Sequence, residues 1–450
     1  MLSACNRGDL MIYTDIQRKL RAAGVVGAGG AGFPTYVKFG AKADIFLVNA
    51  AECEPLLKVD QQLMVAHAKQ LIRGLELGMQ ATGATEGVVA IKSKYTDAIA
   101  AITPLLHSTM RIHILKDIYP AGDEVITIWM ATGRRVPPAK LPLDVGVVVN
   151  NPQTLINVAR AVDEAEPVIF RTVTVSGAVT HPITVTVPIG TAFADMIKMA
   201  GGVSVGSAAY VEGGPMMGKL INNLTDSVTK TTGGIIALPE DHIIIRRHRQ
   251  PIEAQLRIAK TTCEQCCLCT ELCPRHIIGH ELPPHLIVRA VNYSDIAAPS
   301  ILLSALTCSE CNICEAWSCP VDISPMRINR LLKAKFRAEG GHYDGELRNM
   351  DPMTEYRLLP TSRLIARLAI EPYNHPAPLI NSVYQPDTVT LNLSQHIGTP
   401  AIPIVKKGDK VLQKQCIAEV PEDKLGVPIH ASITGIVDEV TRHTIRIQQV

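Results

Sequence analysis

Eight of the chain's 12 cysteines stand in two closely spaced groups. The first group has the pattern Cys-x2-Cys-x2-Cys-x3-Cys-Pro, and the second repeats it 45 positions later with one extra residue before its Cys-Pro. Thiolates at this spacing let one turn of backbone reach three corners of an iron–sulfur cubane while its amides face the sulfides. The groups are Cys263, Cys266, Cys269 and Cys273, and Cys308, Cys311, Cys314 and Cys319.

These groups predict two 4Fe-4S clusters in an all-helical, ferredoxin-type module. In two-cluster ferredoxins the cysteine before proline ligates the other cluster, so we expect Cys319 to complete the first cluster and Cys273 the second. Structural zinc is the alternative, but it needs only four ligands, usually in two separated pairs. The close clustering argues against a disulfide framework and for a reducing, intracellular compartment. Cys267, an extra thiol within the first group, is expected to be a non-ligand.

A second candidate site is the glycine-rich run that begins at Gly27 and ends at Phe33-Pro34. Its glycines satisfy G-x-G-x-x-G literally, but the dinucleotide fingerprint requires a strand before the run and a helix directly after it. Here a helical segment precedes the run and a proline follows it, so a plain Rossmann fold is not expected. A glycine-rich turn still exposes backbone N–H groups and lets a phosphate or a flavin edge approach closely.

The run from Gly27 to Lys38 resembles the FMN loop of the NADH-binding flavoprotein subunit of respiratory complex I and of the Rnf complex C subunit. Three further segments resemble that family's flavin site and follow in the same order. They are Asn-Ala-Ala-Glu-Cys-Glu-Pro at 49–55, Tyr-Pro-Ala-Gly-Asp-Glu at 119–124, and the pair Asn150-Asn151. Ala51 departs from the family pattern, which often has an acid at this position.

The resemblance implies roles for individual side chains. The nicotinamide side, where hydride transfer occurs, would be lined by Glu54 and Glu124. The phosphate side of FMN would be held by Lys38 and the loop glycines, Gly27, Gly29, Gly30 and Gly32. The ring and ribityl contacts would come from Asn49, Glu52, Asn150 and Asn151, with Tyr119, Gly122 and Thr154 completing the site and Phe33 as a stacking surface. The alternative is a solvated loop position for each acid and core packing for Phe33.

The elements that must position these residues predict a multidomain protein of α/β and α+β class. Apolar runs at 45–48, 88–91, 112–115 and 145–149 suit buried parallel strands, and a long helix is expected near 61–81. The predicted units are an α/β FMN- and NADH-binding domain, a β-grasp (SLBB-like) domain, a helical two-cluster domain, a proline-rich irregular linker and a barrel-sandwich (lipoyl/biotinyl-like) β domain. Their predicted limits are 13–166, 167–250, 251–340, 341–386 and 387–450.

Composition limits the partners. Lys and Arg number 44 against 42 acids, a formal net charge of +2, so no basic field for nucleic acid is expected. No apolar stretch approaches the ~20 residues of a membrane helix. Leu2-Ser3-Ala4-Cys5 has the form of a lipoprotein cleavage box, but only four residues precede its cysteine, so we interpret it as an ordinary terminus.

The C-terminal position of the barrel-sandwich unit resembles the cobalamin reductase of propanediol-utilisation microcompartments. That resemblance implies NADH-dependent reduction of cob(III)alamin to cob(I)alamin, a cobalamin adenosyltransferase and a microcompartment shell protein as partners, and a cytoplasmic location inside the microcompartment. The alternative is the C-type electron-transfer subunit of an Rnf-like NADH:ferredoxin membrane complex, which shares nearly all motifs. Lys424 falls where lipoyl domains carry their modified lysine, and we expect it to be unmodified.

Overall fold

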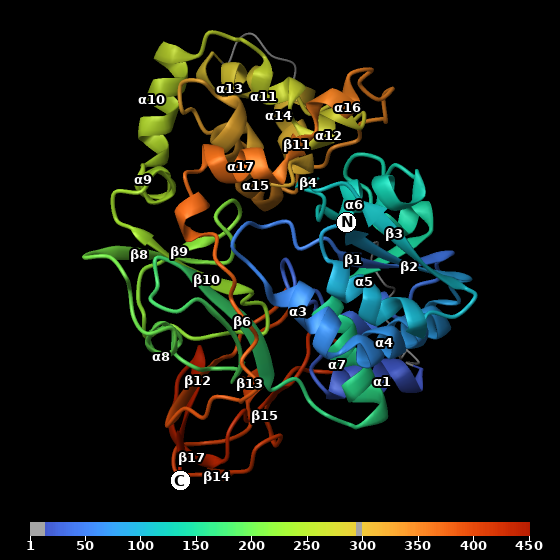
Figure 1. Cartoon of the computed structure of the whole chain (residues 1–450), viewed down its shortest axis with the longest axis vertical. Helices are drawn as coiled ribbons and strands as arrows, with labels where there is room; N and C mark the ends of the chain where they lie inside the picture. Colours follow the sequence, from blue (N-terminus) through green and yellow to red (C-terminus); the bar gives the residue numbers. More distant parts are fainter. Residues whose placement is uncertain (1–13, 294–298) are drawn as a thin grey trace.

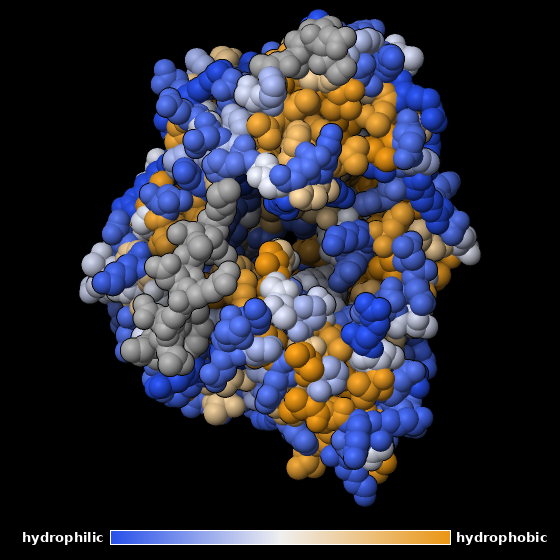
Figure 2. Space-filling model, turned by 180° about the vertical axis from the view of Figure 1, so that it is seen from behind, coloured by the Kyte–Doolittle hydropathy of each residue, from blue (hydrophilic) through white to orange (hydrophobic). Residues whose placement is uncertain are grey.

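A computed structural model describes residues 14–293 and 299–450. The Leu2–Cys5 segment and the first predicted domain limit, residue 13, lie outside the described residues. In Figure 1 the flavin-type domain is blue to cyan, the β-grasp domain is green, the cysteine-rich domain is at the top and the C-terminal sheets are at the bottom. Figure 2 shows the opposite face, which is hollowed near its centre, below the cysteine-rich domain.

The first domain is built on a four-stranded parallel sheet in the order β3-β2-β1-β5. The central strand β1 is buried on both faces, as a parallel strand covered by helices should be. One face packs on α4 and α7, where Leu71 and Leu155 are fully buried, and the other packs on α6 through Ile128. The strands and helices are β1 (Ile45–Ala50), β2 (Glu86–Lys92), β3 (Met110–Leu115), β5 (Val147–Asn150), α4 (Ala68–Thr82), α6 (Glu124–Thr132) and α7 (Pro152–Asp163).

The single helix expected near 61–81 is two helices, so that prediction was wrong in detail. The chain leaves helical geometry at His67, between α3 (Val59–Ala66) and α4. The remaining helices of this domain are α1 (Asp15–Ala22), α2 (Thr35–Lys38) and α5 (Thr96–Ile102).

The second domain is a five-stranded mixed sheet, β7-β6-β10-β8-β9, with α8 packed on one face. The first two strands form the predicted antiparallel hairpin, and β10 adds to β6 in parallel. This strand–strand–helix–strand order is the expected β-grasp arrangement. The bounds are β6 (Phe170–Gly177), β7 (Ile183–Pro188), α8 (Phe193–Met199), β8 (Ala208–Glu212), β9 (Lys219–Ile221), β10 (Gly234–Pro239) and the helix that follows, α9 (Ile243–Arg249).

The cysteine-rich domain is helical, as predicted. Its long helices pack around a core that contains Ile287 and Ile328. The helices are α10 (Ile252–Thr262), α11 (Leu268–Glu271), α12 (Pro274–Ile277), α13 (Pro284–Asn292), α14 (Pro299–Leu303) and α15 (Pro325–Ala338).

The segment 341–386 is more ordered than an irregular linker. It forms α16 (Thr354–Arg357), β11 (Leu359–Pro360) and α17 (Thr361–Arg367), and β11 pairs antiparallel with β4 (Ile118–Tyr119) of the flavin-type domain. Leu359 and Leu364 are buried in a core shared with the cysteine-rich and β-grasp domains. These elements are too short to leave a periodic pattern, and their apolar partners are distant in the sequence.

The C-terminal unit consists of two facing sheets, β12-β18-β17-β14 and β13-β15-β16, around one apolar core. This is the predicted barrel-sandwich class. Its strands are β12 (Thr388–Asn392), β13 (Ile402–Pro403), β14 (Lys410–Val411), β15 (Cys416–Glu419), β16 (Ile429–His430), β17 (Gly435–Val440) and β18 (Thr444–Gln449). In the described part of the chain, no helix is long and apolar enough to cross a membrane.

A close helix contact below the parallel sheet gives a stability prediction. A Cβ added at Gly74 in α4 would lie 2.1 Å from the carbonyl oxygen of Leu155 in α7. Alanine in a helix normally favours folding by about 1 kcal/mol over glycine, but overpacking against rigid backbone costs about 1–3 kcal/mol. We expect Gly74→Ala to lower the apparent midpoint of thermal unfolding. Gly206→Ala is the control, because a Cβ there meets nothing within 4 Å; equal midpoints for the two variants would contradict the packing argument.

Candidate functional site

The carboxyl ends of β1 and β5 mark the first candidate site. The strand order 3-2-1-5 reverses between these two strands, and open α/β sheets bind ligands at such a switch point. Asn49 stands at the end of β1 and Asn150 at the end of β5, and the two strands pair in parallel. The predicted flavin segments therefore meet at one edge of the sheet.

The glycine loop lies against this edge. Gly27 donates its N–H to the carbonyl of Phe33 over 2.9 Å, which closes the loop. The N–H of Ala28 donates to Thr154 Oγ1 over 2.8 Å, so the first turn of α7 holds the loop. Gly30 and Gly32 have positive φ, at 65° and 69°, which glycine adopts without strain.

Asn151 and Glu52 use their side chains to cap helices beside the loop. Asn151 Oδ1 accepts from the Gln153 N–H at the start of α7, and its Nδ2 donates to Asp60 over 2.7 Å. Glu52 accepts from the backbone of Asp60 and Gln61 at the start of α3, over 2.7 and 3.2 Å. Burial raises the pKa of Glu52 despite these bonds. Both residues thus support the site's framework directly.

Lys38 and Glu124 lie together, although the resemblance assigned them to different ends of the cofactor. Lys38 Nζ is 3.4 Å from Glu124 Oε1 and donates to the carbonyl of Val149 over 2.9 Å. Asn49 Nδ2 donates to the Gly122 carbonyl over 2.9 Å, which joins the 49–55 and 119–124 segments. These four predicted residues form one group on the α6 side of the sheet edge.

Glu54 and Tyr119 form a joint between domains. The Glu54 carboxylate accepts from the backbone N–H groups of Met216 and Met217 over 3.0 Å each, and Tyr119 Oη lies 3.4 Å from it. Tyr119 also donates to the carbonyl of Cys311 over 2.8 Å. Burial raises the pKa of Glu54 from 4.5 to about 7.

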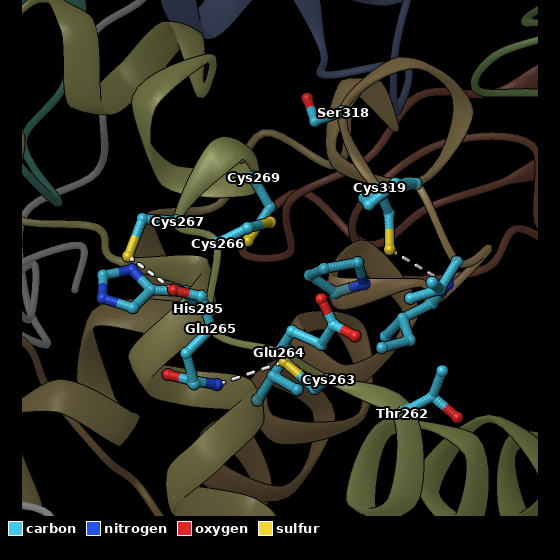
Figure 3. Close-up of a pocket in the computed structure, with 15 residues that line it drawn as sticks. Thr262, Cys263, Glu264, Gln265, Cys266, Cys267, Cys269, His285, Ser318 and Cys319 are labelled. Atoms are coloured by element: carbon cyan, nitrogen blue, oxygen red, sulfur yellow. Dashed lines mark hydrogen bonds between the residues drawn. The ribbon is translucent and has the colours of Figure 1, made fainter.

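The outer cysteine set consists of Cys263, Cys266, Cys269 and Cys319. All four line one pocket of the cysteine-rich domain. Figure 3 shows their sulfurs facing a common space; Cys267 also lines this pocket, but its sulfur is directed away from that space. Burial raises the pKa of Cys269 to about 12, and Cys319 is the thiolate whose charge acts on it most strongly.

The inner cysteine set consists of Cys308, Cys311, Cys314 and Cys273. Burial raises the pKa of Cys273 to about 12, and Cys308 is the thiolate that acts on it. Burial also raises the pKa of Cys311, with Cys273 as the strongest thiolate neighbour. The structure thus brings each Cys-Pro cysteine to the other group, the arrangement that cross-ligation requires.

The two motifs share one backbone conformation. In the first, Gln265 and Cys267 have φ of 55° and 65°; in the second, the equivalent Glu310 and Asn312 have φ of 60° and 66°. Left-handed residues at these positions turn backbone N–H groups inward. Cys267 therefore occupies a backbone position that Asn312 fills in the second motif, and its thiol donates to the Gln265 carbonyl.

The extra residue of the second motif is absorbed as a π-helical turn, Cys314–Ser318. The N–H of Cys319 donates to the carbonyl of Cys314, five residues earlier, over 3.1 Å, whereas the N–H of Cys273 donates to Thr270, three residues earlier. A π-bulge accommodates one additional residue without displacing its flanks. The departure from the bacterial spacing therefore leaves Cys319 beside the first group.

The donor set fits iron–sulfur clusters. The backbone N–H groups of Glu310 and Ile323 lie 3.4 and 3.3 Å from the sulfurs of Cys308 and Cys319, as in amide-bonded cluster thiolates. Among residues 14–293 and 299–450, no three His, Cys, Asp or Glu side chains converge on a single-ion position. A cubane distributes its thiolates over four irons, so its ligands need not share one point.

The flavin edge also fits its cofactor. Asn150 is 6% exposed and its Nδ2 has no hydrogen-bond partner, and Thr35 Oγ1 is likewise buried and unpartnered. Buried polar atoms are usually paired, so the unpaired amide of Asn150, at the end of β5, fits a polar ligand at the carboxyl edge of the sheet. A Cβ at Gly30 would meet nothing within 4 Å, which leaves the loop open.

Sequence reasoning missed the charged contacts around the inner set. Arg275 pairs with Asp123 over 2.9 Å, with both side chains largely buried, and Lys333 donates to the Cys308 carbonyl over 2.7 Å. One signal was available, since Arg275 directly follows Cys273-Pro274 and Asp123 stands inside a flavin segment.

Lys424 is exposed and paired with Asp423 over 3.4 Å.

Cross-ligation predicts which variants lose the same cluster. Cys319→Ala and Cys266→Ala should each remove about half of the iron and the same electron paramagnetic resonance signal, because both residues belong to the outer set. Cys273→Ala should remove the other signal. Cys267→Ala is the control and should retain full iron and sulfide. A Cys319→Ala protein that loses the signal lost by Cys311→Ala would contradict the pairing.

Glu54 predicts a pH-dependent domain joint. Its pKa is about 7 in the folded protein against 4.5 ordinarily, so the folded state binds this proton more tightly than the unfolded state. The contribution of Glu54 to the free energy of unfolding is fully present below pH ~4.5, and about 1–3 kcal/mol of it is lost as the pH rises through 7. Glu54→Gln should flatten this part of the profile of unfolding midpoint between pH 5 and 8. Exposed Glu253→Gln serves as the control; a Glu54→Gln profile as steep as wild type would exclude the joint as the cause.

Comparison with known proteins identifies each unit. Family models match as Nuo51 FMN-binding domain over 20–160, SLBB domain over 172–220, 4Fe-4S dicluster domain over 262–324 and RnfC barrel sandwich hybrid domain over 375–449. The predicted fold class is confirmed. The chain carries an FMN-binding domain and a 4Fe-4S dicluster domain, which confirms these two cofactor types.

Full-length relatives are found as well. Cobalamin reductase PduS of Citrobacter freundii is 58% identical over 432 residues, 96% of each chain, and that of Salmonella typhimurium strain LT2 is 56% identical over 448 residues, 99% of each chain. The C-type subunit of the Na(+)-translocating ferredoxin:NAD(+) oxidoreductase complex of Acetobacterium woodii is 35% identical over 270 residues, 58% of each chain. The chain therefore belongs to the family of cobalamin reductase PduS, a family of oxidoreductases.

Proposed function

We propose that this protein is an NADH-dependent reductase of cobalamin that uses one FMN and two 4Fe-4S clusters. The observation that carries the electron-transfer part is the direct contact between the flavin-type domain and the inner cysteine set through Tyr119 and Cys311. The corrinoid acceptor rests on the names of the two full-length relatives.

In this proposal the sheet edge and the glycine loop hold FMN, and Asn150 supplies an unpaired amide to it. Bound FMN would accept a hydride from the nicotinamide and release electrons singly, which one-electron cluster and corrinoid steps require. Glu124 and Lys38 line the α6 side of the edge as a neutralised pair. Glu54, held by the β-grasp domain, orients the 49–55 segment and contacts Tyr119.

The two cysteine sets have different positions relative to the flavin-type domain. Arg275, next to Cys273, is paired with Asp123 of that domain, so the inner set lies at the domain interface. Cys266 of the outer set is exposed, whereas Cys311 and Cys314 of the inner set are buried. We infer the order flavin edge, inner set, outer set, surface. Arg275 and Lys333 beside the inner set are paired with Asp123 and Glu310, so the set lies next to two compensated ion pairs.

The final reduction to cob(I)alamin is uphill for a nicotinamide donor, so consumption of the product must draw it forward. A bound cobalamin adenosyltransferase would provide this and shield a reactive nucleophile from water. A shell-protein contact and a location inside a bacterial microcompartment complete the proposal. The units would divide at 166, 250, 340 and 386, as expected from the sequence.

One anaerobic assay tests the proposal. Holoprotein, NADH and cob(III)alamin should yield cob(II)alamin by absorbance, and addition of adenosyltransferase with ATP should yield adenosylcobalamin. Cys266→Ala, which lacks an outer ligand, should retain flavin but lose most of this rate, whereas exposed Glu253→Gln should match wild type. Ready reduction of a ferredoxin or a quinone without any adenosylcobalamin would instead favour the Rnf-like alternative.

A further inference from the structure

Arg171 is a buried arginine that crosses from the β-grasp domain to the glycine loop. It stands near the start of β6 and is 5% exposed. Its Nη2 donates to the carbonyl of Ala28 over 2.6 Å, and its Nε donates to the carbonyl of Thr232 over 2.6 Å. One guanidinium therefore joins the loop of one domain to the sheet of another.

The third nitrogen of Arg171 is unsatisfied. Nη1 is buried and has no hydrogen-bond partner. Asp60 is the acid whose charge acts on Arg171, but no ion pair between them is found in the described part of the chain, and the Asp60 carboxylate accepts from Asn151. An unpaired buried guanidinium N–H is costly. Because the guanidinium is a rigid planar fork, this N–H lies beside the same glycine loop.

The surroundings suit an oxyanion. The N-terminus of α7, a helix of 12 residues capped by Asn151, lies beside the loop and contributes a positive dipole end. Gly29 and Gly30 are both exposed. A Cβ added at Gly29 would have Asn151 Nδ2 as its nearest neighbour, at 3.9 Å, and a Cβ added at Gly30 would have no neighbour within 4 Å. The glycine loop and the N-terminus of α7 thus border open space, and the unpaired guanidinium N–H lies buried on the inner side of the same loop.

We propose that Arg171 binds the phosphate of flavin mononucleotide, so that the β-grasp domain supplies a specificity residue to the flavin site. This rests on the proposed function, in which the glycine loop holds FMN. Lys38 was expected in this role, but its ammonium is already paired with Glu124 and the Val149 carbonyl. Arginine also matches a phosphate better than lysine does, because its planar fork offers parallel donors.

The acids near Arg171 do not oppose this assignment. The Glu52 carboxylate is directed at the amides that begin α3. Asp60 is directed at Asn151, and burial together with the charge of Glu52 raises its pKa. A pair of acids that share a buried site holds a proton more readily than either would alone. The phosphate would therefore meet less negative charge than two free carboxylates present.

The test compares FMN with riboflavin, which lacks the phosphate. Deflavinated full-length protein is titrated with each flavin, and binding is followed by quenching of flavin fluorescence. Wild type should bind FMN more tightly than riboflavin. Arg171→Gln should weaken FMN binding about 10- to 100-fold, the range of a lost charge-assisted contact, and leave riboflavin binding nearly unchanged. Arg171→Lys should retain part of the preference.

Arg247→Gln is the matched control, since it removes another guanidinium with unpaired buried nitrogens, in α9. It should leave the FMN-to-riboflavin ratio at the wild-type value. An equal loss of both flavins in Arg171→Gln and Arg171→Lys would show a structural role at the domain contact and overturn the inference. An unchanged ratio in Arg171→Gln would overturn it too. Wild-type protein that binds neither flavin would refute the proposed function itself, and the inference with it.

Discussion

The buried hydroxyl of Tyr119 is the contact on which the arrangement of the redox sites depends. Tyr119 is 1% exposed, and its hydroxyl donates to the backbone of Cys311 and lies against Glu54. Because Glu54 is in turn held by two β-grasp amides, three domains meet around one side chain. The residue belongs to β4, to which β11 of the 341–386 segment is paired. Because a phenol hydroxyl buried in an apolar core needs a hydrogen-bond partner, Tyr119 favours the one relative position of these units that supplies it.

The cysteine-rich domain shows how a sequence repeat tolerates imperfection. Its motifs reproduce the same left-handed positions at an offset of 45, from 265 to 310 and from 267 to 312. The repeat is broken by one residue before Cys319, and the π-turn takes up that residue locally. Without it, the Cys-Pro cysteine would be displaced from the first group. The extra residue before Cys319 departs from the ferredoxin spacing, but it is compatible with placing Cys319 beside the first cysteine group.

The elements that could be predicted are those whose signal is local. Buried parallel strands, the β-grasp hairpin and the cysteine turns follow from short apolar runs, period-two alternation and ligand spacing. The order of 341–386 and the break at His67 could not be predicted, because each depends on contacts made after distant segments pack. The same limit applied to the site. The motifs indicated Glu54 and Lys38, but the partners of these residues are set by tertiary structure. Glu54 accepts from the backbone of Met216 and Met217, and Lys38 pairs with Glu124.

The C-terminal unit reaches the glycine loop although it is the last to appear in the chain. The N–H of Ile397 donates to the carbonyl of Ala31, and a Cβ at Gly32 would meet Gln395 and His396 at 3.3 Å. Lys230, 3% exposed, donates to the carbonyls of Gly24 and Pro428 over 2.7 and 3.2 Å, and burial lowers its pKa to about 7. A lysine that is easily neutralised can donate to two carbonyls at a smaller desolvation cost than a fully charged one. Three units thus contact the loop, at Ala28, Ala31 and Gly32, and leave Gly29 and Gly30 exposed. The ordered segment 341–386 makes these contacts possible, because it carries the chain from the cysteine-rich domain back to the C-terminal unit, whose Ile397 reaches Ala31.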